Sequence, residues 1–279
     1  QIEVARKCNL HCLMCGSQFF PRQDETPFIE IDLVKKIVDE GDLEGSFFIE
    51  LQLTGEPLLH PQLSKIIDIV KTADVMVGLS TNGILMSQQL EALSKLDYIT
   101  FSLDSIDNYE RIRLGKKPKG FNLIQSIKDF LPIAQKNNIS IDVQLIELEG
   151  WEDQFQKVSD VFKDDNIMVR TVPNGMNLFI FPDLINPSQE MCLNLFMSVS
   201  IQCTGVVSAC CNSPGDDIQL GNLNSQTLKE IWEGDEIRKL REEHMTRNYR
   251  HICSRCYMRS PVLFHWRLFL GSIKKRNVL

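Results

Sequence analysis

The sequence predicts an α/β protein built on a parallel sheet. Short runs of β-branched or apolar residues alternate with stretches of helical spacing along the first 172 residues. This alternation is typical of repeated strand–helix–strand units, in which helices cover a parallel sheet. The periodicity leaves open whether the sheet is doubly wound or a partial barrel. In either architecture, sites gather at the carboxyl ends of the strands.

The expected strands cover residues 2–5, 47–53, 75–80, 98–103, 140–146 and 167–172. The expected helices cover residues 33–40, 62–71, 87–96, 121–137 and 151–163. Each helix is expected because apolar residues recur three or four positions apart, as they do at Leu63, Ile66 and Val70. Asp32 is the expected N-cap of the first helix. After residue 173 the regular alternation of strand and helix patterns ends and an irregular segment with several prolines begins. This change predicts a barrel-like domain at 1–173, a second domain at 174–256 and a basic tail at 257–279.

The composition excludes several classes of protein. The net charge of −7 argues against a general nucleic-acid binder. There is no apolar stretch of about 20 residues, so no transmembrane segment is expected, and no secretory signal is evident. The nine cysteines fall in two groups, at 8–15 and 192–256. In the expected cytoplasmic location, clustered cysteines are more often metal ligands than disulfides.

The first cysteine group has the spacing Cys8-x3-Cys12-x2-Cys15. Three thiolates on one loop can hold three irons of a [4Fe–4S] cubane and leave the fourth iron open. A zinc site is the alternative, but structural zinc usually has four ligands, and His11 inside the loop is poorly placed to be the fourth. The spacing favours iron–sulfur and leaves zinc open.

Further motifs lie at the ends of later strands. They are LTGEP (53–57), STNG (80–83), SLDS (102–105) and the Arg113 that follows them. Together with CNLHCLMC (8–15), and in this order, they resemble the radical S-adenosylmethionine superfamily. One departure is Thr54, which stands where the family carries the first glycine of its GGEP motif. The resemblance implies a partial (β/α)6 barrel that cleaves S-adenosylmethionine reductively to a 5′-deoxyadenosyl radical.

The resemblance also implies which residues bind the cofactor. Gly55 would let the backbone approach the methionyl end, and Glu56 would accept from its ammonium group. Asp104 would bond a ribose hydroxyl or the methionyl end, and Arg113 would pair with the carboxylate. The alternative interpretations are that residues 55–57 form an ordinary turn, that Asp104 belongs to a polar strand terminus, and that Arg113 is a surface arginine. The complete expected set is Gly55, Glu56, Pro57, Ser80, Asn82, Ser102, Asp104, Arg113 and Gln144.

The second cysteine group is similar to the SPASM/twitch extension of radical enzymes, which includes GNL at 221–223 and TLKEIW at 227–232. The resemblance implies one auxiliary [4Fe–4S] cluster, held by Cys192, Cys210, Cys253 and Cys256, with a zinc ribbon as the alternative. Cys211 is disfavoured because adjacent strand residues point to opposite faces. Cys203 could replace Cys192 but fits the spacing less well.

The expected activity is oxidation or epimerisation of a small polar metabolite, such as an amino sugar, cyclitol or polyol. The layout is similar to that of short aminocyclitol dehydrogenases. Arg170, at the end of the last expected strand, is the candidate catalytic residue. Modification of a ribosomally made peptide is the main alternative, and a non-catalytic iron–sulfur scaffold is a third. A flavodoxin or ferredoxin is the expected reductant. The tail at 257–279 is expected to pack as an amphipathic helix.

Overall fold

The computed structural model describes the chain except for residues 17–25, 41–42, 44, 173–189, 212–217 and 257–279. Its larger part is a five-stranded sheet whose strands lie in chain order and pair in parallel. The strands are β1 (Phe48–Glu50), β2 (Met76–Thr81), β3 (Tyr98–Ser102), β4 (Ser140–Ile146) and β5 (Met168–Val172). The predicted parallel α/β architecture is therefore confirmed.

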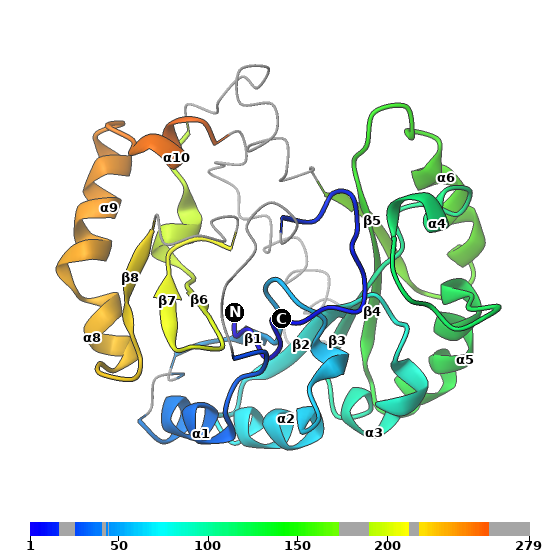
Figure 1. Ribbon diagram of the computed structural model, residues 1–279, viewed down its shortest axis with the longest axis horizontal. Helices are drawn as coiled ribbons and strands as arrows, with labels where there is room; N and C mark the ends of the chain where they lie inside the picture. Colours follow the sequence, from blue (N-terminus) through cyan, green and yellow to red (C-terminus); the bar gives the residue numbers. More distant parts are fainter. Residues whose placement is uncertain (17–25, 41–42, 44, 173–189, 212–217, 257–279) are drawn as a thin grey trace.

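Helices cover the convex side of this sheet (Figure 1). The helix expected at 87–96 is the least regular of them, because a 3-10 turn, η3 (Met86–Gln88), precedes a single turn of α-helix. Asp32 lies in the first turn of α1 and Glu30 is its N-cap, so the expected cap is displaced. The helices are α1 (Ile31–Asp39), α2 (Leu63–Lys71), α3 (Leu90–Leu93), α4 (Tyr109–Ile112), α5 (Leu123–Lys136) and α6 (Gln154–Phe162).

The two faces of the sheet differ in chemistry. Successive strand residues point to opposite faces, and Phe101 on the convex face meets Phe130 of α5 edge-on, with ring centroids 6.5 Å apart. The neighbouring residues of β3, Tyr98, Thr100 and Ser102, therefore point to the concave face. Their register partners in β4 are Ser140, Asp142 and Gln144. Branched apolar residues dominate the interior of a closed barrel, whereas this concave face is polar.

The expected first strand, residues 2–5, does not join the sheet as a regular strand. It forms isolated bridges, one of them between Ile2 and Ile201. The Ile2 N–H donates to the Glu50 carbonyl and the Glu3 N–H donates to the Ile201 carbonyl. The segment thus divides its hydrogen bonds between β1 and the second domain, which is why neither ladder extends along it.

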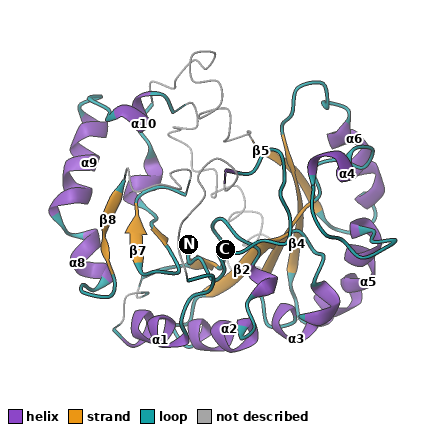
Figure 2. Ribbon diagram, viewed as in Figure 1, coloured by secondary structure: helices purple, strands orange, loops and turns teal. Residues whose placement is uncertain are grey.

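The second domain is a three-stranded antiparallel sheet with helices beside it (Figure 2). Gly205, at φ +86°, makes the turn between the first two strands. The TLKEIW segment forms α8, which begins with a capping box between Thr227 and Glu230. The elements are η5 (Leu193–Phe196), β6 (Ser200–Ile201), β7 (Val206–Ser208), β8 (Gln219–Asn222), α8 (Leu228–Trp232), α9 (Asp235–Met245) and α10 (His251–Ser254).

None of the helices in the described part of the chain has both the length and the apolar character needed to cross a membrane. The expected amphipathic tail at 257–279 lies outside the described residues.

His60 gives the fold a pH dependence. The side chain is buried, its Nδ1 accepts from the Gln62 N–H at 3.0 Å, and its Nε2 lies 3.1 Å from the Ile29 carbonyl. An Nδ1 that accepts a hydrogen bond belongs to a neutral ring, and burial lowers the pKa of His60. Its place after η2 (Pro57–Leu59) fits a structural role rather than that of a base.

We expect the protein to lose stability as the pH falls below about 6.5, the ordinary pKa of histidine. The unfolded chain then binds a proton that folded His60 does not, so protonation favours unfolding. In urea unfolding at neutral and mildly acidic pH, His60→Gln should lose less stability on acidification than the wild type. Equal losses in both proteins would contradict this assignment.

Candidate functional site

The loop with the first three cysteines is held by the segment after α4. Leu10 and Gly115 form an antiparallel bridge, and the Leu13 N–H donates to the Ile112 carbonyl at 3.0 Å. The Cys15 N–H turns back to the Cys12 carbonyl at 3.0 Å. The cysteine loop is therefore fixed by backbone pairing to another part of the barrel.

The thiols of Cys8, Cys12 and Cys15 are near enough to influence one another's ionisation. Burial raises the pKa of Cys8 to about 11, and the nearby charges of Glu56, Cys12 and Cys15 raise it further, while a backbone hydrogen bond from Leu10 opposes them. Burial also raises the pKa of Cys12. Buried thiols of this kind become thiolates when a metal centre compensates their charge.

The chemistry of this donor set fits a cubane cluster. Among the described residues, no three His, Cys, Asp or Glu side chains are spaced to hold a single metal ion. A cubane bonds each thiolate to a different iron, so its ligands stand further apart than those of one ion. Cys8, Cys12 and Cys15 would hold three irons, and the adjacent Glu56 is already engaged by the protein.

Glu56 connects the turn that contains it to the carboxyl end of β2. Its buried carboxylate accepts from the Thr81 hydroxyl at 2.6 Å, the Asn82 N–H at 2.9 Å and the Leu58 N–H at 3.1 Å. Burial raises its pKa, and these hydrogen bonds oppose the rise. The expected ammonium acceptor thus has a structural role, since it ties the end of β2 to the GEP turn. A carboxylate offers about four acceptor positions, so one remains for a ligand.

Gly55 allows two backbone segments of the protein to approach each other closely. A Cβ at this position would lie 2.1 Å from the Ala5 carbonyl oxygen and 2.7 Å from the Arg6 carbonyl carbon. The GEP turn therefore rests on the backbone just before the cysteine loop, where the Glu56 N–H also donates to the Lys7 carbonyl. The glycine expected to make room for the cofactor makes room for this contact.

We expect Gly55→Ala to destabilise the protein by about 1–3 kcal/mol, because backbone atoms have to move apart. Gly120→Ala is the matched control. Its added Cβ meets nothing within 4 Å and only its φ of +75° opposes the change, so a cost of about 1 kcal/mol is expected. Urea unfolding and iron content after reconstitution check both variants. A Gly55→Ala protein that unfolds and loads iron like the wild type would contradict the close contact.

Asp104 and Arg113 form a buried pair beside Cys12. Arg113 Nε donates to Asp104 Oδ2 at 2.6 Å, and its Nη1 lies 3.8 Å from Cys12 Sγ. Asp104 has φ +62°, and its other oxygen accepts from the Ile146 N–H at 3.0 Å. Arg113 is thus anchored by a carboxylate of the protein and places positive charge next to a thiol.

The other residues expected to bind the cofactor lie at the same edge of the sheet. Asn82 donates to the Asn9 side chain in the cysteine loop at 2.8 Å. Ser102 pairs in register with Gln144, whose carbonyl accepts from the Leu103 N–H at 3.1 Å. Pro57 begins η2, and Ser80 lies near the end of β2.

Arg170 lies on the concave face, in β5. Its Nε is 3.4 Å from Asp142 Oδ2, and its Nη2 is 3.4 Å from both the Tyr98 and Thr100 hydroxyl groups. The Tyr98 hydroxyl donates to Asp142 at 3.0 Å. Sequence reasoning singled out Arg170 but missed Tyr98 and Asp142, which alternation with apolar neighbours in their strands could have placed on the same face.

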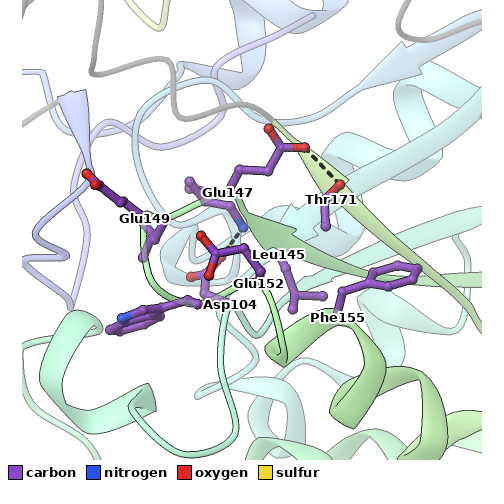
Figure 3. A pocket seen from close by; sticks show the side chains of 10 residues that line it. Asp104, Leu145, Glu147, Glu149, Glu152, Phe155 and Thr171 are labelled. Carbon is purple, nitrogen blue, oxygen red and sulfur yellow. Dashed lines mark hydrogen bonds between the residues drawn. The ribbon is translucent and has the colours of Figure 1, made fainter.

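A cavity of about 420 Å³ opens at the rim of the barrel, at the ends of β4 and β5. Figure 3 shows Glu147, Glu149 and Glu152 around it, with Phe155 of α6 on another side. Glu147 accepts from the Thr171 hydroxyl at 3.0 Å. The remaining lining residues are Asp104, Leu145, Ile146, Leu148 and Trp151.

The C-terminal cysteines are brought together around η5 and α10. Burial raises the pKa of Cys192, and the charges of Cys256 and Cys211 add to the rise. The Cys256 N–H donates to the Cys253 carbonyl at 3.1 Å. Cys210 and Cys211 follow the end of β7 and lie outside the strand, so strand alternation does not separate them. The neighbouring Cys210 side chain lowers the pKa of Cys211. The choice of Cys210 stays a prediction.

Sequence reasoning missed a buried junction between the two domains. The Glu3 carboxylate pairs with Arg6 at 2.8 Å, and it accepts from the Thr54 hydroxyl and from the Cys203 N–H. Arg6 also donates to Gln202 at 3.0 Å. Thr54, the departure from the GGEP pattern, thus has a partner in Glu3. Cys203 lies in this junction, where its thiol donates to the Thr26 carbonyl at 3.4 Å.

The family model of the radical SAM superfamily matches residues 2–145, more than half of the chain. The chain belongs to this superfamily. A second model, an iron–sulfur cluster-binding domain of the SPASM type, matches residues 192–257. Both cysteine groups of this radical SAM protein therefore lie in segments that match models of iron–sulfur families, as the resemblance implied.

The chain is also similar in sequence to individual curated proteins. A GTP 3′,8-cyclase of Chlorobaculum tepidum is 34% identical over 61% of the chain and 51% of its own length. The match covers between 25% and 59% of the length of the curated relatives.

Two solved structures share the fold over nearly the whole chain. The structure of anSMEcpe with AdoMet and the Cp18Cys peptide covers 99% of the chain and 98% of its own, at TM-score 0.64 and 14% identity. The structure of BtrN with AdoMet and 2-DOIA covers 94% and 95%, at TM-score 0.57 and 15% identity.

Proposed function

We propose that this radical SAM protein abstracts a hydrogen atom from a small polar metabolite and so oxidises or epimerises it. When bound, the cluster and S-adenosylmethionine supply the reductive cleavage of a sulfonium bond and the carbon radical that removes the hydrogen. Cys8, Cys12 and Cys15 would hold that cluster. The residues of the chain bind, orient and shield the reactants.

The residues around the three thiols would hold S-adenosylmethionine at the open iron. Arg113 presents positive charge beside Cys12 and is kept in place by Asp104. It can attract the carboxylate of the methionyl end, and the remaining acceptor position of Glu56 can bond the ammonium group. The apolar walls of the rim cavity, including Leu148 and Trp151, suit the adenine, while its carboxylates suit ribose hydroxyls.

The auxiliary cluster would be held by Cys192, Cys210, Cys253 and Cys256. Four thiolates close the coordination of such a cluster, so it would accept or supply an electron rather than bind S-adenosylmethionine. The iron content expected for the two clusters is about eight atoms per chain.

The observation that supports a polar substrate is the polar character of the concave face of the sheet. Tyr98, Asp142 and Arg170 lie where a closed barrel would hold branched apolar residues. The Arg170 guanidinium lies 3.4 Å from these partners and has further N–H groups that can donate to a substrate hydroxyl or carboxylate. Arg170 is therefore the proposed substrate-positioning residue.

The test is substrate-dependent formation of 5′-deoxyadenosine by the anaerobically reconstituted protein. Aminocyclitols, amino sugars and polyols carrying deuterium are expected to transfer it to 5′-deoxyadenosine, whereas peptides are not. Arg170→Lys should keep the slow cleavage without substrate and lose most of the stimulation by substrate. Deuterium transfer from a peptide alone would replace this proposal with peptide modification, and bound zinc in place of iron would overturn it.

A further inference from the structure

The hydroxyl of Tyr109 is a buried donor that the protein itself does not satisfy. Tyr109 is the first residue of α4, and its side chain is half-buried. The hydroxyl oxygen is closed off from solvent, and no group in the described part of the chain forms a hydrogen bond with it. A buried polar group without a partner costs free energy, and such groups are commonly explained by a role at a site or by a ligand that completes it.

Tyr109 lies among the charged groups around Cys12. Arg113, one turn further along the chain, has its Nη1 3.8 Å from Cys12 Sγ. Burial raises the pKa of Tyr109, the positive charge of Arg113 opposes this rise, and the negative charges of Cys12 and Asp104 add to it. The phenol therefore keeps its proton at neutral pH and faces this cysteine as a hydrogen-bond donor.

The Tyr109 ring is held in place by its neighbours. The Arg113 N–H donates to the Tyr109 carbonyl at 2.9 Å. The ring packs at a tilt against Phe121, with centroids 6.4 Å apart, and Lys117 Nζ lies 5.3 Å from the ring centroid. The segment after α4 is itself paired with the cysteine loop along the backbone. The hydroxyl is therefore preorganised beside the loop, and it has no acceptor there until the site is filled.

We propose that the Tyr109 hydroxyl donates a hydrogen bond to a sulfur atom of the [4Fe–4S] cluster next to Cys12 and so raises the reduction potential of that cluster. The inference rests on the proposed function, which places the cluster on Cys8, Cys12 and Cys15. Reduction adds one electron to the cluster, while the phenol keeps its proton and no bond breaks. A hydrogen bond to a cluster sulfur stabilises the added negative charge, and such bonds help to set the potentials of iron–sulfur clusters. Tyr109 thus makes electron transfer to the cluster more favourable.

Tyr109→Phe tests the proposal, because it removes the hydroxyl and keeps the ring and its packing. In a dithionite titration of the reconstituted protein, followed by electron paramagnetic resonance, reduction of the catalytic cluster should become about tenfold less favourable, a fall of about 59 mV for one electron. The matched control is Tyr98→Phe. Tyr98 is also buried, but it lies at the start of β3 and its hydroxyl donates to Asp142 at 3.0 Å, so the potential should stay at the wild-type value.

A second readout observes the hydrogen bond directly. Electron–nuclear double resonance of the reduced cluster should show an exchangeable proton in the wild type that is lost in Tyr109→Phe. A wild-type potential in iron-loaded Tyr109→Phe, or an equal fall in Tyr98→Phe, would overturn the role of Tyr109 and leave the proposed function standing. A wild-type protein that takes up no iron on its first three cysteines would refute the proposed function and this inference with it.

Discussion

Replacing Cys12 with alanine is expected to lower the iron content from about eight to about four atoms per chain and to abolish 5′-deoxyadenosine formation. Cys12 is buried in the middle of the cysteine loop, and its thiol is the one that Arg113 approaches at 3.8 Å. Two thiolates on the loop would not retain the cluster. Iron and sulfide analysis after anaerobic reconstitution, together with electron paramagnetic resonance of the reduced protein, measures the loss.

Cys203→Ala is the matched control for this loss. Cys203 is as buried as Cys12, but its thiol donates to the Thr26 carbonyl and its N–H to Glu3, in the junction between the domains. The variant should keep about eight irons and form 5′-deoxyadenosine. If Cys12→Ala kept the full iron content, the assignment of the catalytic ligands would be wrong. If Cys203→Ala lost half of the iron, the assignment of the auxiliary ligands would be wrong.

Glu3→Ala is expected to destabilise the protein by about 3–5 kcal/mol, because it removes the buried carboxylate that pairs with Arg6 at 2.8 Å. The side chain of Glu3 is 0% exposed and that of Arg6 is 9% exposed. The change also removes the acceptor for Thr54 and for the Cys203 N–H. Urea unfolding of the reconstituted protein, followed by circular dichroism, gives the free energy of unfolding.

An exposed pair with the same spacing is the control. Asp235 and Arg238 are also three residues apart and 3.2 Å from each other, but their side chains are 98% and 65% exposed. Asp235→Ala should therefore cost less than about 1 kcal/mol. A Glu3→Ala protein that unfolds at the same urea concentration as Asp235→Ala would show that the junction is not held by this buried pair.

Most of the barrel could be predicted because its elements are strongly periodic. The expected strand at 140–146 is β4 to the residue, and the buried face of α2 contains the apolar residues expected there. The elements that were missed depend on long-range pairing. Residues 2–5 have the composition of a strand, but their hydrogen bonds go to two different sheets, and composition carries no information about which partner lies alongside.

The candidate site divides in the same way. Motif order placed Glu56, Asp104 and Arg113 at the strand ends, and the structure brings Glu56 near Cys8 and the other two near Cys12. It also shows that their first partners are protein groups, such as the Thr81 hydroxyl for Glu56. These partners are far apart in the chain, so short-range spacing could not identify them.

The sequence by itself determined the family, the parallel α/β fold and the two cysteine groups, because these rest on the order of short motifs, on local periodicity and on cysteine spacing. The tertiary structure alone decided two further features. Gly55 makes room for the backbone of residues 5 and 6, and the Thr54 hydroxyl donates to the buried Glu3 carboxylate. Each is a contact between segments distant in sequence, and such contacts are set by how the elements pack rather than by any local preference.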